Sequence, residues 1–153
     1  MTNVLEIKNL TKTYHTPKGE TEAIKNISLD IKQGEIVGIV GSSGCGKSTL
    51  LNILAGLDEP TDGSISSYNL RSAYMLQSDA LLPWLNVLDN ACIGLKIMHI
   101  KTDDNIEYVK ELLKSFGLEN FMYAYPNNLS GGMRQRVALI RTLAIKPNII
   151  FLD

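Results

Sequence analysis

Two stretches near the N-terminus alternate apolar and polar residues, which is the pattern of a β-strand with one face buried. In residues 4–10, Leu5 and Ile7 alternate with charged neighbours. In residues 27–32, isoleucine and leucine alternate with serine, aspartate and lysine. We expect two half-exposed strands that pair with each other in antiparallel orientation.

Other apolar runs do not alternate, as expected for strands that are covered on both faces in a parallel sheet. Residues 36–40 read IVGIV and residues 149–152 read IIFL, and a short strand is expected at 73–76. The run at 149–152 is followed by Asp153. This arrangement predicts a central parallel strand with a carboxylate at its C-terminal tip.

Apolar residues at helical spacing predict three longer helices. The first is expected over residues 47–57, where Gly56 with Pro60 would close the segment. Thr102 and Ser130 are expected to cap the second and third helices, which Gly117 and Pro147 would end. The predicted apolar stripes are, in order, Leu50, Leu51, Leu54 and Leu57; Ile106, Val109, Leu112, Leu113 and Phe116; and Met133, Val137, Ile140 and Ala144.

Composition and charge narrow the functional classes. The chain has 153 residues, of which 44% are hydrophobic and 20% charged, as in one globular domain with a real core. Its formal net charge of -1 provides no excess positive field for a nucleic-acid backbone. We therefore expect no nucleic-acid partner, and any bound polyanion should be small.

Cysteine usage and hydropathy indicate the compartment. The two cysteines, Cys45 and Cys92, match neither a disulfide framework nor a zinc site, so a reducing cytosol is expected. The N-terminus has the alternation of a strand and not the apolar stretch of a signal peptide. No apolar run approaches the roughly 18 residues of a membrane span, so a partner would have to supply any membrane segment.

The segment GSSGCGKST, residues 41–49, fits the phosphate-loop pattern G-x-x-x-x-G-K-[ST] and lies between a predicted strand and a predicted helix. Its glycines let the backbone turn N–H groups toward a phosphate, and the helix N-terminus adds partial positive charge. Lys47 brings a full charge to the terminal phosphates, while Ser48 offers a hydroxyl to Mg²⁺. The structural alternative is a glycine-rich turn with a solvated lysine. The predicted phosphate-binding residues are Gly41, Ser42, Ser43, Gly44, Cys45, Gly46, Lys47, Ser48 and Thr49.

Residues 129–144, LSGGMRQRVALIRTLA, resemble the signature segment of ABC ATPases, and they lie between the phosphate loop and Asp153 as in that family. Ser130, Gly131 and Gly132 open a helix whose free N–H groups form another phosphate site. The resemblance implies a head-to-tail homodimer in which this segment of one subunit closes over the ATP of the other. An ordinary serine-capped helix is the alternative.

Two further positions agree with the family. Tyr14, in LTKTY, lies where ABC ATPases place an aromatic ring on adenine, and Gln77, in YMLQ, matches the glutamine that senses magnesium and the attacking water. Considered alone, a tyrosine at a strand end is usually packed and a loop glutamine is usually solvated. The resemblance implies ATP and Mg²⁺ as cofactors, with Lys47, Gln77 and Asp153 as catalytic residues and Ser48, Gln77 and Asp153 at the metal.

Residues 77–90, QSDALLPWLNVLDN, resemble the corresponding region of the nitrate, sulfonate and taurine importer ATPases, and Met133 supports the same group. In that group the region precedes the helical subdomain that contacts membrane subunits. Leu81, Leu82 and Trp84 therefore have two interpretations, as core residues or as residues that dock a partner.

The resemblance implies an α/β fold: a P-loop NTPase core with a parallel central sheet, an N-terminal antiparallel β subdomain and an inserted α-helical subdomain. One ABC ATPase domain, residues 1–153, would comprise an antiparallel part at 1–34, the nucleotide-binding core at 35–84, the helical subdomain with the signature at 85–146 and the Walker B strand at 147–153. A sheet-edge hairpin between Gly63 and Tyr74 is expected to be trimmed.

In ABC ATPases the residue after the aspartate that corresponds to Asp153 is a glutamate that polarises water, and a switch histidine comes later in the chain. We therefore expect a domain that is incomplete at its C-terminus and binds ATP without efficient hydrolysis. The intact protein would couple MgATP hydrolysis to the import of a solute such as a nitrate-, sulfonate- or taurine-like anion. Its partners would be membrane permease subunits and, indirectly, an extracytoplasmic solute-binding protein, at the cytoplasmic face of the cell membrane.

Three other functions share parts of this pattern. A soluble ABC ATPase of repair or translation would carry every motif. A non-enzymatic nucleotide-binding fragment would be favoured by the missing C-terminal residues. A GTPase or small-molecule kinase would share only the phosphate loop, and the N-K-x-D pattern that reads guanine does not occur in the chain.

Overall fold

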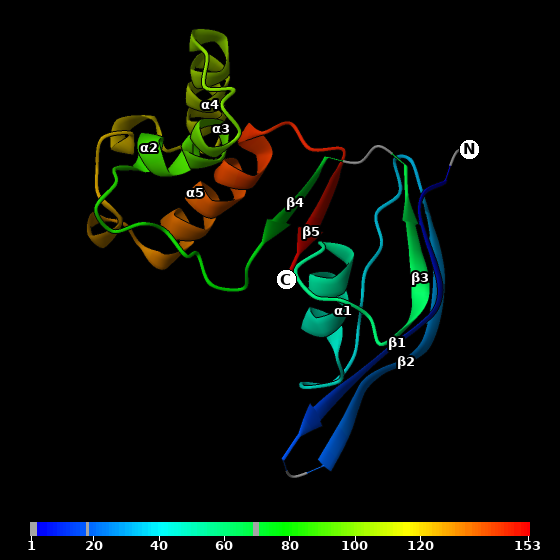
Figure 1. Ribbon diagram of the computed structural model, residues 1–153. Helices are drawn as coiled ribbons and strands as arrows, with labels where there is room; N and C mark the ends of the chain where they lie inside the picture. The colour runs from blue at the N-terminus through cyan, green and yellow to red at the C-terminus, as the bar shows by residue number, and fades with distance from the viewer. Residues whose placement is uncertain (1–2, 18, 69–70) are drawn as a thin grey trace. The chain divides into compact units, whose positions relative to one another are not determined.

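The computed structural model describes residues 3–17, 19–68 and 71–153, and the chain divides into two compact units (Figure 1). The first unit contains residues 1–70 together with Asp153, and the second contains residues 71–152. Each unit has a β-sheet of its own.

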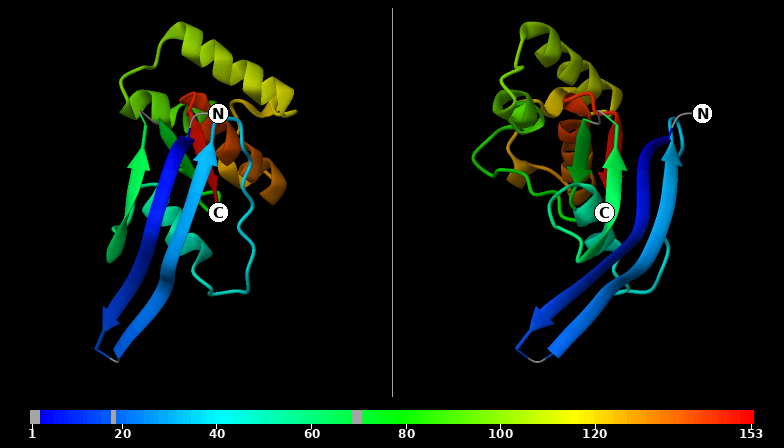
Figure 2. Two further views of the ribbon diagram at one scale, coloured as in Figure 1. Left: turned by 90° about the vertical axis from the view of Figure 1, so that its right-hand side faces the viewer. Right: turned by 45° about the vertical axis from the view of Figure 1, so that its right-hand side comes forward.

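The first unit is built on a three-stranded antiparallel sheet of order β2-β1-β3. Its strands are β1 (Asn3–Thr16), β2 (Gly19–Lys32) and β3 (Asp62–Ser67). Figure 2 shows β1 and β2 running side by side along their length. Leu5 pairs with Ile31, and Ile7 lies between Leu29 on one side and Ile65 on the other. Leu5 and Ile7 are buried, so the predicted antiparallel pairing and the inward face are confirmed.

Helix α1 (Lys47–Leu54) follows the glycine-rich loop and buries Leu50 and Leu51. The helix ends before the predicted Leu57, whereas the prediction that Gly56 closes this segment is confirmed. Gly56 has a φ of 74°, and the Leu57 N–H donates to the carbonyl of Asn52, which is the bond of a Schellman C-cap. The chain leaves the helix there, and Leu57 is 63% exposed.

The predicted buried strand at residues 36–40 is also absent, which corrects the sequence-based expectation. This segment has no regular secondary structure, and Ile36 and Val40 are 98% and 95% exposed. A central strand needs hydrogen-bonded neighbours on both edges. Among the strands of the described residues, none pairs with residues 36–40, so its apolar side chains have no sheet to enter.

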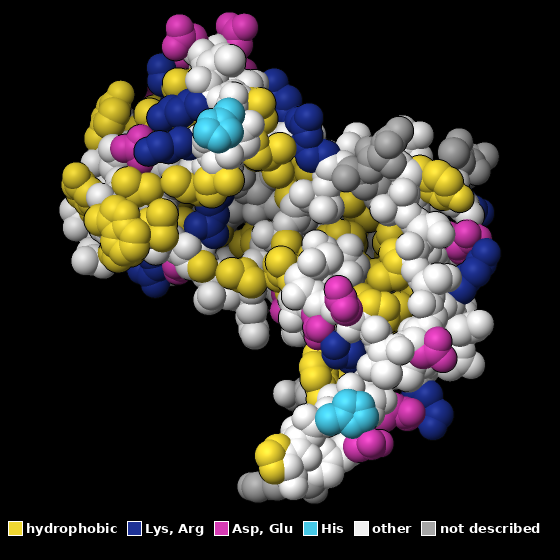
Figure 3. All heavy atoms as spheres, in the orientation of Figure 1, with side chains coloured by type: hydrophobic (Ala, Val, Ile, Leu, Met, Phe, Trp, Pro, Cys, Tyr) yellow, Lys and Arg dark blue, Asp and Glu magenta, His cyan; other side chains and the backbone are white. Residues whose placement is uncertain are grey.

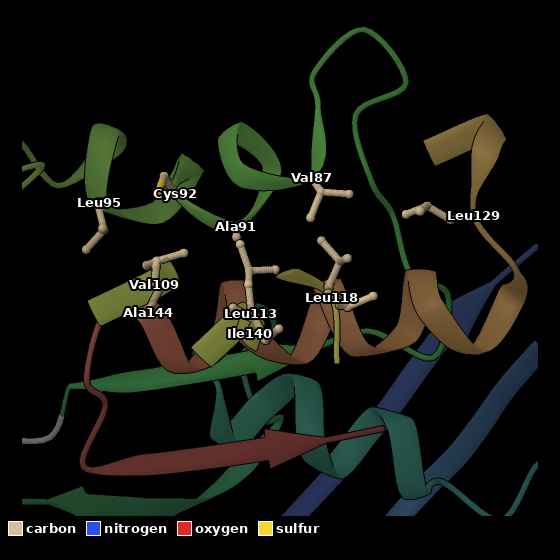
Figure 4. Packing of buried hydrophobic residues seen from close by; sticks show 11 residues of the cluster. Val87, Ala91, Cys92, Leu95, Val109, Leu113, Leu118, Leu129, Ile140 and Ala144 are labelled. Carbon is tan, nitrogen blue, oxygen red and sulfur yellow. The ribbon is translucent and has the colours of Figure 1, made fainter. Parts of the chain in front are cut away.

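The second unit combines a two-stranded parallel sheet with a helical core. Strand β4 (Ser72–Met75) pairs with β5 (Ile149–Leu152), as the unalternated run at 149–152 predicts. The helical elements are α2 (Val87–Ala91), α3 (Ile93–Ile97), α4 (Asp103–Ser115), η1 (Glu119–Phe121), η2 (Pro126–Asn128) and α5 (Gly131–Ala144). Figure 4 shows buried side chains of these helices pointing toward one another.

The helix boundaries in this unit match the predicted caps. The Thr102 side chain accepts a hydrogen bond from the Asn105 N–H, and the Ser130 side chain accepts one from the Met133 N–H. Gly117, with a φ of 70°, follows α4, and α5 ends before Pro147. Within the described part of the chain, no helix has the length and apolar character needed to cross a membrane.

The shortened hairpin predicted between Gly63 and Tyr74 cannot be followed throughout, because residues 69–70 lie outside the described residues. The segments on either side of them are β3 and β4.

Candidate functional site: a glycine-rich phosphate loop

The loop that precedes α1 has the backbone conformation that glycine permits. Gly44 and Gly46 have φ values of 78° and 95°, which residues with a side chain rarely adopt. Gly46 also passes so close to β2 that a Cβ there would collide with the carbonyl oxygen of Ala23. The two glycines therefore shape the loop, and Gly46 sets its position against the sheet.

Lys47 is the first residue of α1, and its ammonium group folds back into the loop. The Lys47 Nζ donates to the carbonyl oxygens of Gly41 at 3.0 Å and Ser42 at 2.8 Å. Gly46 caps the helix without a side-chain hydrogen bond, and the first N–H groups of a helix have no partner within the helix. The full positive charge of the Lys47 ammonium and the partial positive charge of the α1 N-terminus therefore lie together at the loop.

A hydroxyl and a carboxylate meet beside the loop, although 105 positions separate them in sequence. Ser48, in the first turn of α1, donates from its Oγ to the Oδ1 of Asp153 at 2.9 Å. Mg²⁺ takes oxygen ligands such as hydroxyl and carboxylate groups. The Ser48 and Asp153 oxygens therefore have the chemistry of two Mg²⁺ ligands, and their hydrogen bond places them beside each other.

This pair differs from an all-protein metal cage. The described residues contain no group of three or more histidine, cysteine, aspartate or glutamate side chains that could hold a metal ion. Mg²⁺ is commonly held by one or two protein oxygens together with phosphate oxygens and water. The donor set at Ser48 and Asp153 fits an ion that arrives with a phosphorylated ligand.

The first unit therefore contains the phosphate loop at 41–46, Lys47, Ser48, Thr49 and Asp153, and it also contains Tyr14, in β1. The other predicted site residues, Gln77 and the signature residues, belong to the second unit. There, Ser130 caps α5, and Gly131 and Gly132 form its first turn. Gln77 follows β4, and its carbonyl oxygen accepts a hydrogen bond from the Gln135 side chain of α5 at 3.3 Å.

Arginines of α5 hold the loop after Gln77, a feature that the sequence analysis missed. Arg141 donates to the carbonyl oxygens of Asp79 and Ala80, both at 2.8 Å. Arg134 forms an ion pair with the Asp79 carboxylate at 2.9 Å and also donates to the Leu129 carbonyl. Burial lowers the pKa of the Arg141 guanidinium. The predicted signature helix is thus fastened to the glutamine loop within the second unit.

Leu81, Leu82 and Trp84 had two interpretations, as core residues or as residues that dock a partner, and neither fits all three. Leu81 packs against the helical core. Trp84, in contrast, is 70% exposed, so it is not a core residue. Figure 3 shows hydrophobic side chains gathered on the visible face of the second unit. The large exposed hydrophobic residues of that unit include Trp84, Ile97, Met98, Phe121, Tyr123 and Tyr125.

Buried Asn90 is another residue that the sequence analysis did not identify. Its Oδ1 accepts from the Leu82 N–H at 2.8 Å, and its Nδ2 donates to the carbonyls of Leu82, Leu85 and Asn86. One fully buried amide therefore fixes the backbone of the segment that presents Trp84. The sequence offered no sign of this role, because an asparagine where a loop meets a helix is ordinarily a cap or a turn residue.

Comparison with known proteins agrees with this geometry. The family model described as ABC transporter matches residues 24–153. An ABC transporter ATP-binding protein of Methanocaldococcus jannaschii is 41% identical over 97% of this chain and 58% of that protein. A nitrate import ATP-binding protein of Synechocystis sp. is 40% identical, and a taurine import ATP-binding protein of Jannaschia sp. is 41% identical, each over 97% of this chain and 59% of the relative.

A solved structure supports the same conclusion at the level of the fold. The ATP-binding cassette MJ0796, in a dimeric post-hydrolysis state bound to ADP and Pi, matches with a TM-score of 0.87 and 37% identity, over 97% of this chain and 73% of that one. The chain spans about 60% of the length of the curated relatives it matches. The predicted fold class is confirmed, with an antiparallel N-terminal sheet and a parallel sheet in a mixed α/β fold. This chain belongs to the ABC transporter family, as one of its ATP-binding domains.

Proposed function

We propose that this chain binds MgATP through the loop at residues 41–46 and the start of α1. The observation that supports this most strongly is the joint placement of the Lys47 ammonium inside the loop and the Ser48–Asp153 oxygen pair beside it. A triphosphate needs positive charge around its terminal phosphates and oxygen ligands for its metal ion. The first unit provides both.

Each group of residues would have its own task. Backbone N–H groups from Gly44 to Thr49 surround the phosphates, and Lys47 neutralises charge on the terminal groups. Ser48 and Asp153 would hold Mg²⁺, which would supply positive charge to offset that of the phosphates during phosphoryl transfer. Gln77 would contact the metal ion and the attacking water. We also propose a head-to-tail dimer, in which Ser130, Gly131 and Gly132 would bind the ATP of the partner subunit.

The whole protein, in this proposal, is the ATPase subunit of an importer. The nitrate and taurine import ATP-binding proteins are similar over nearly the whole chain, and the segment with exposed Trp84 resembles the same importer group. Permease subunits would bind it at the cytoplasmic face of the membrane, with a solute-binding protein acting through them. The solute would be a small anion, which other subunits select.

Calorimetric titration with MgATP tests the proposed site. We expect binding that requires magnesium and is weakened at least about tenfold by Lys47→Ala, because a charge-assisted contact worth about 1.5–3 kcal/mol is lost. Lys25→Ala is the matched control, since Lys25 is an exposed lysine of the same unit that pairs only with Glu22 among the described residues. Equal affinity of the wild type and Lys47→Ala would refute the proposal.

A soluble ABC ATPase outside transport remains the second candidate, because it would share every motif of the site. The exposed aromatic residues of the second unit favour a partner-bound subunit. Co-purification of the tagged protein with a permease from its native membrane would support the importer. Recovery of the protein only with soluble partners would support the alternative.

A further inference from the structure

A lysine and a carboxylate hold the ring of Tyr14 in the first unit. The Tyr14 hydroxyl donates to the Oδ2 of Asp58 at 2.9 Å, and the Lys12 ammonium donates to the Oδ1 of the same carboxylate at 2.7 Å. Lys12 also donates to the carbonyl of Glu59 at 2.6 Å. Each oxygen of the Asp58 carboxylate therefore has its own partner, and one of these partners is the tyrosine.

The same lysine also lies against the ring. The Lys12 Nζ is 4.9 Å from the centroid of the Tyr14 ring, a cation–π distance. Because the ammonium group covers one face, a planar ligand can stack only on the other. Tyr14 remains 38% exposed, so the ring is held but not enclosed.

The segment that carries Asp58 links the ring to the phosphate loop. Asp58 lies just beyond the C-terminal end of α1, and the N-terminal end of that helix carries Lys47 and Ser48. The segment is also anchored without Asp58, because the Thr61 N–H donates to the Thr11 carbonyl at 2.8 Å and Thr61 Oγ1 accepts from the Thr13 N–H at 3.0 Å. Removal of the Asp58 carboxylate should therefore free the ring without detaching the segment.

We propose that Asp58 and Lys12 are positioning residues for the adenine base, which they serve by fixing the ring of Tyr14 for stacking. The inference rests on the proposed function, since it supposes that ATP binds at the phosphate loop and that its base stacks on Tyr14, as the resemblance to ABC ATPases implies. A ring that is already fixed loses little side-chain freedom when a base stacks on it, so affinity is gained without a new contact to the ligand. The hydrogen bonds from Lys12 and Tyr14 lower the pKa of the Asp58 carboxyl, in keeping with their geometry.

Tyr14→Phe separates positioning from stacking, because it keeps the ring and removes only the bond to Asp58. Affinities are measured by calorimetry for MgATP and for magnesium tripolyphosphate, which has the phosphates but no base. We expect Tyr14→Phe to bind MgATP about five times more weakly and tripolyphosphate as tightly as the wild type. Unchanged MgATP affinity in Tyr14→Phe would overturn the inference while leaving the proposed ATP site intact.

A double-mutant cycle identifies Asp58 as the partner. Asp58→Ala should weaken MgATP binding by a similar factor, and Tyr14→Phe should add little in that background, because both changes remove the same bond. Glu59→Ala is the matched control, as it removes an exposed negative charge from the adjacent position and should leave the ratio of the two affinities unchanged. Full additivity of the two changes would contradict the inference.

The remaining outcomes are also decisive. If Asp58→Ala and Glu59→Ala shift the affinities for both ligands equally, the effect is general electrostatics and positioning is refuted. If the wild type binds neither ligand, the proposed function fails and the inference fails with it. Thermal unfolding of each variant checks that a lower affinity does not reflect a loss of folded protein.

Discussion

At the scale of single residues, Asn90 has the largest hydrogen-bonding role among the fully buried side chains of the described residues. We expect Asn90→Ala to lower the free energy of unfolding by at least about 2 kcal/mol, because the Leu82 N–H and nearby carbonyls lose their partner inside the protein. Denaturant titration measures the change. Asn127→Ala, at an exposed position, should stay within about 0.5 kcal/mol of the wild type, and an equally small effect at Asn90 would contradict the structure.

The role of a residue could be predicted from the sequence where a known spacing pattern includes that residue. The phosphate-loop pattern fixes Gly41, Gly46 and Lys47 and leaves the position of Gly44 open. Gly44 and Gly46 have left-handed φ values, whereas Gly41 does not. The roles of Asp58 and Asn90 could not be predicted in this way. Their partners come from backbone and side-chain groups of other segments, which only the folded chain brings within hydrogen-bond distance.

At the scale of elements, Arg141 joins α5 to the loop after β4 by hydrogen bonds to two backbone carbonyl groups of that loop. Arg141→Ala should lower the free energy of unfolding by about 1–3 kcal/mol, since a half-buried guanidinium and its bonds to two carbonyl groups are lost. Hydrogen exchange should become faster in the loop at residues 78–82 before it does in α5 itself. Lys114→Ala, an exposed change on α4, is the control, and equal exchange in both variants would argue against this coupling.

The ends of helices and strands could be predicted only where neighbouring residues in the sequence determine them. The caps at Thr102 and Ser130 were predictable, because a capping hydroxyl and the N–H that it accepts from are three residues apart. The strand expected at residues 36–40 was not, because a β-strand exists only through its neighbours. For α1, the closing glycine Gly56 was predictable as a local signal, whereas apolar spacing placed the last residue of the helix too late, at Leu57.

At the scale of the whole molecule, each unit has its own buried residues. Leu113 lies in the core of the second unit and is fully buried, so Leu113→Ala should cost about 3 kcal/mol there. Because the cavity forms in one unit, amide exchange at Leu5 and Ile7 of the first unit should stay near the wild-type rate. Hydrogen exchange followed residue by residue distinguishes this result from a uniform loss of protection, which would mean that both units unfold together.

The exposed segment at residues 36–40 affects how the protein behaves in solution. IVGIV combines branched apolar residues with no charge and no proline, and no strand of the described residues pairs with it. Such a segment is a template for intermolecular cross-β association. We therefore expect intermolecular association of the purified chain to begin at these five residues, which lie directly before the phosphate loop.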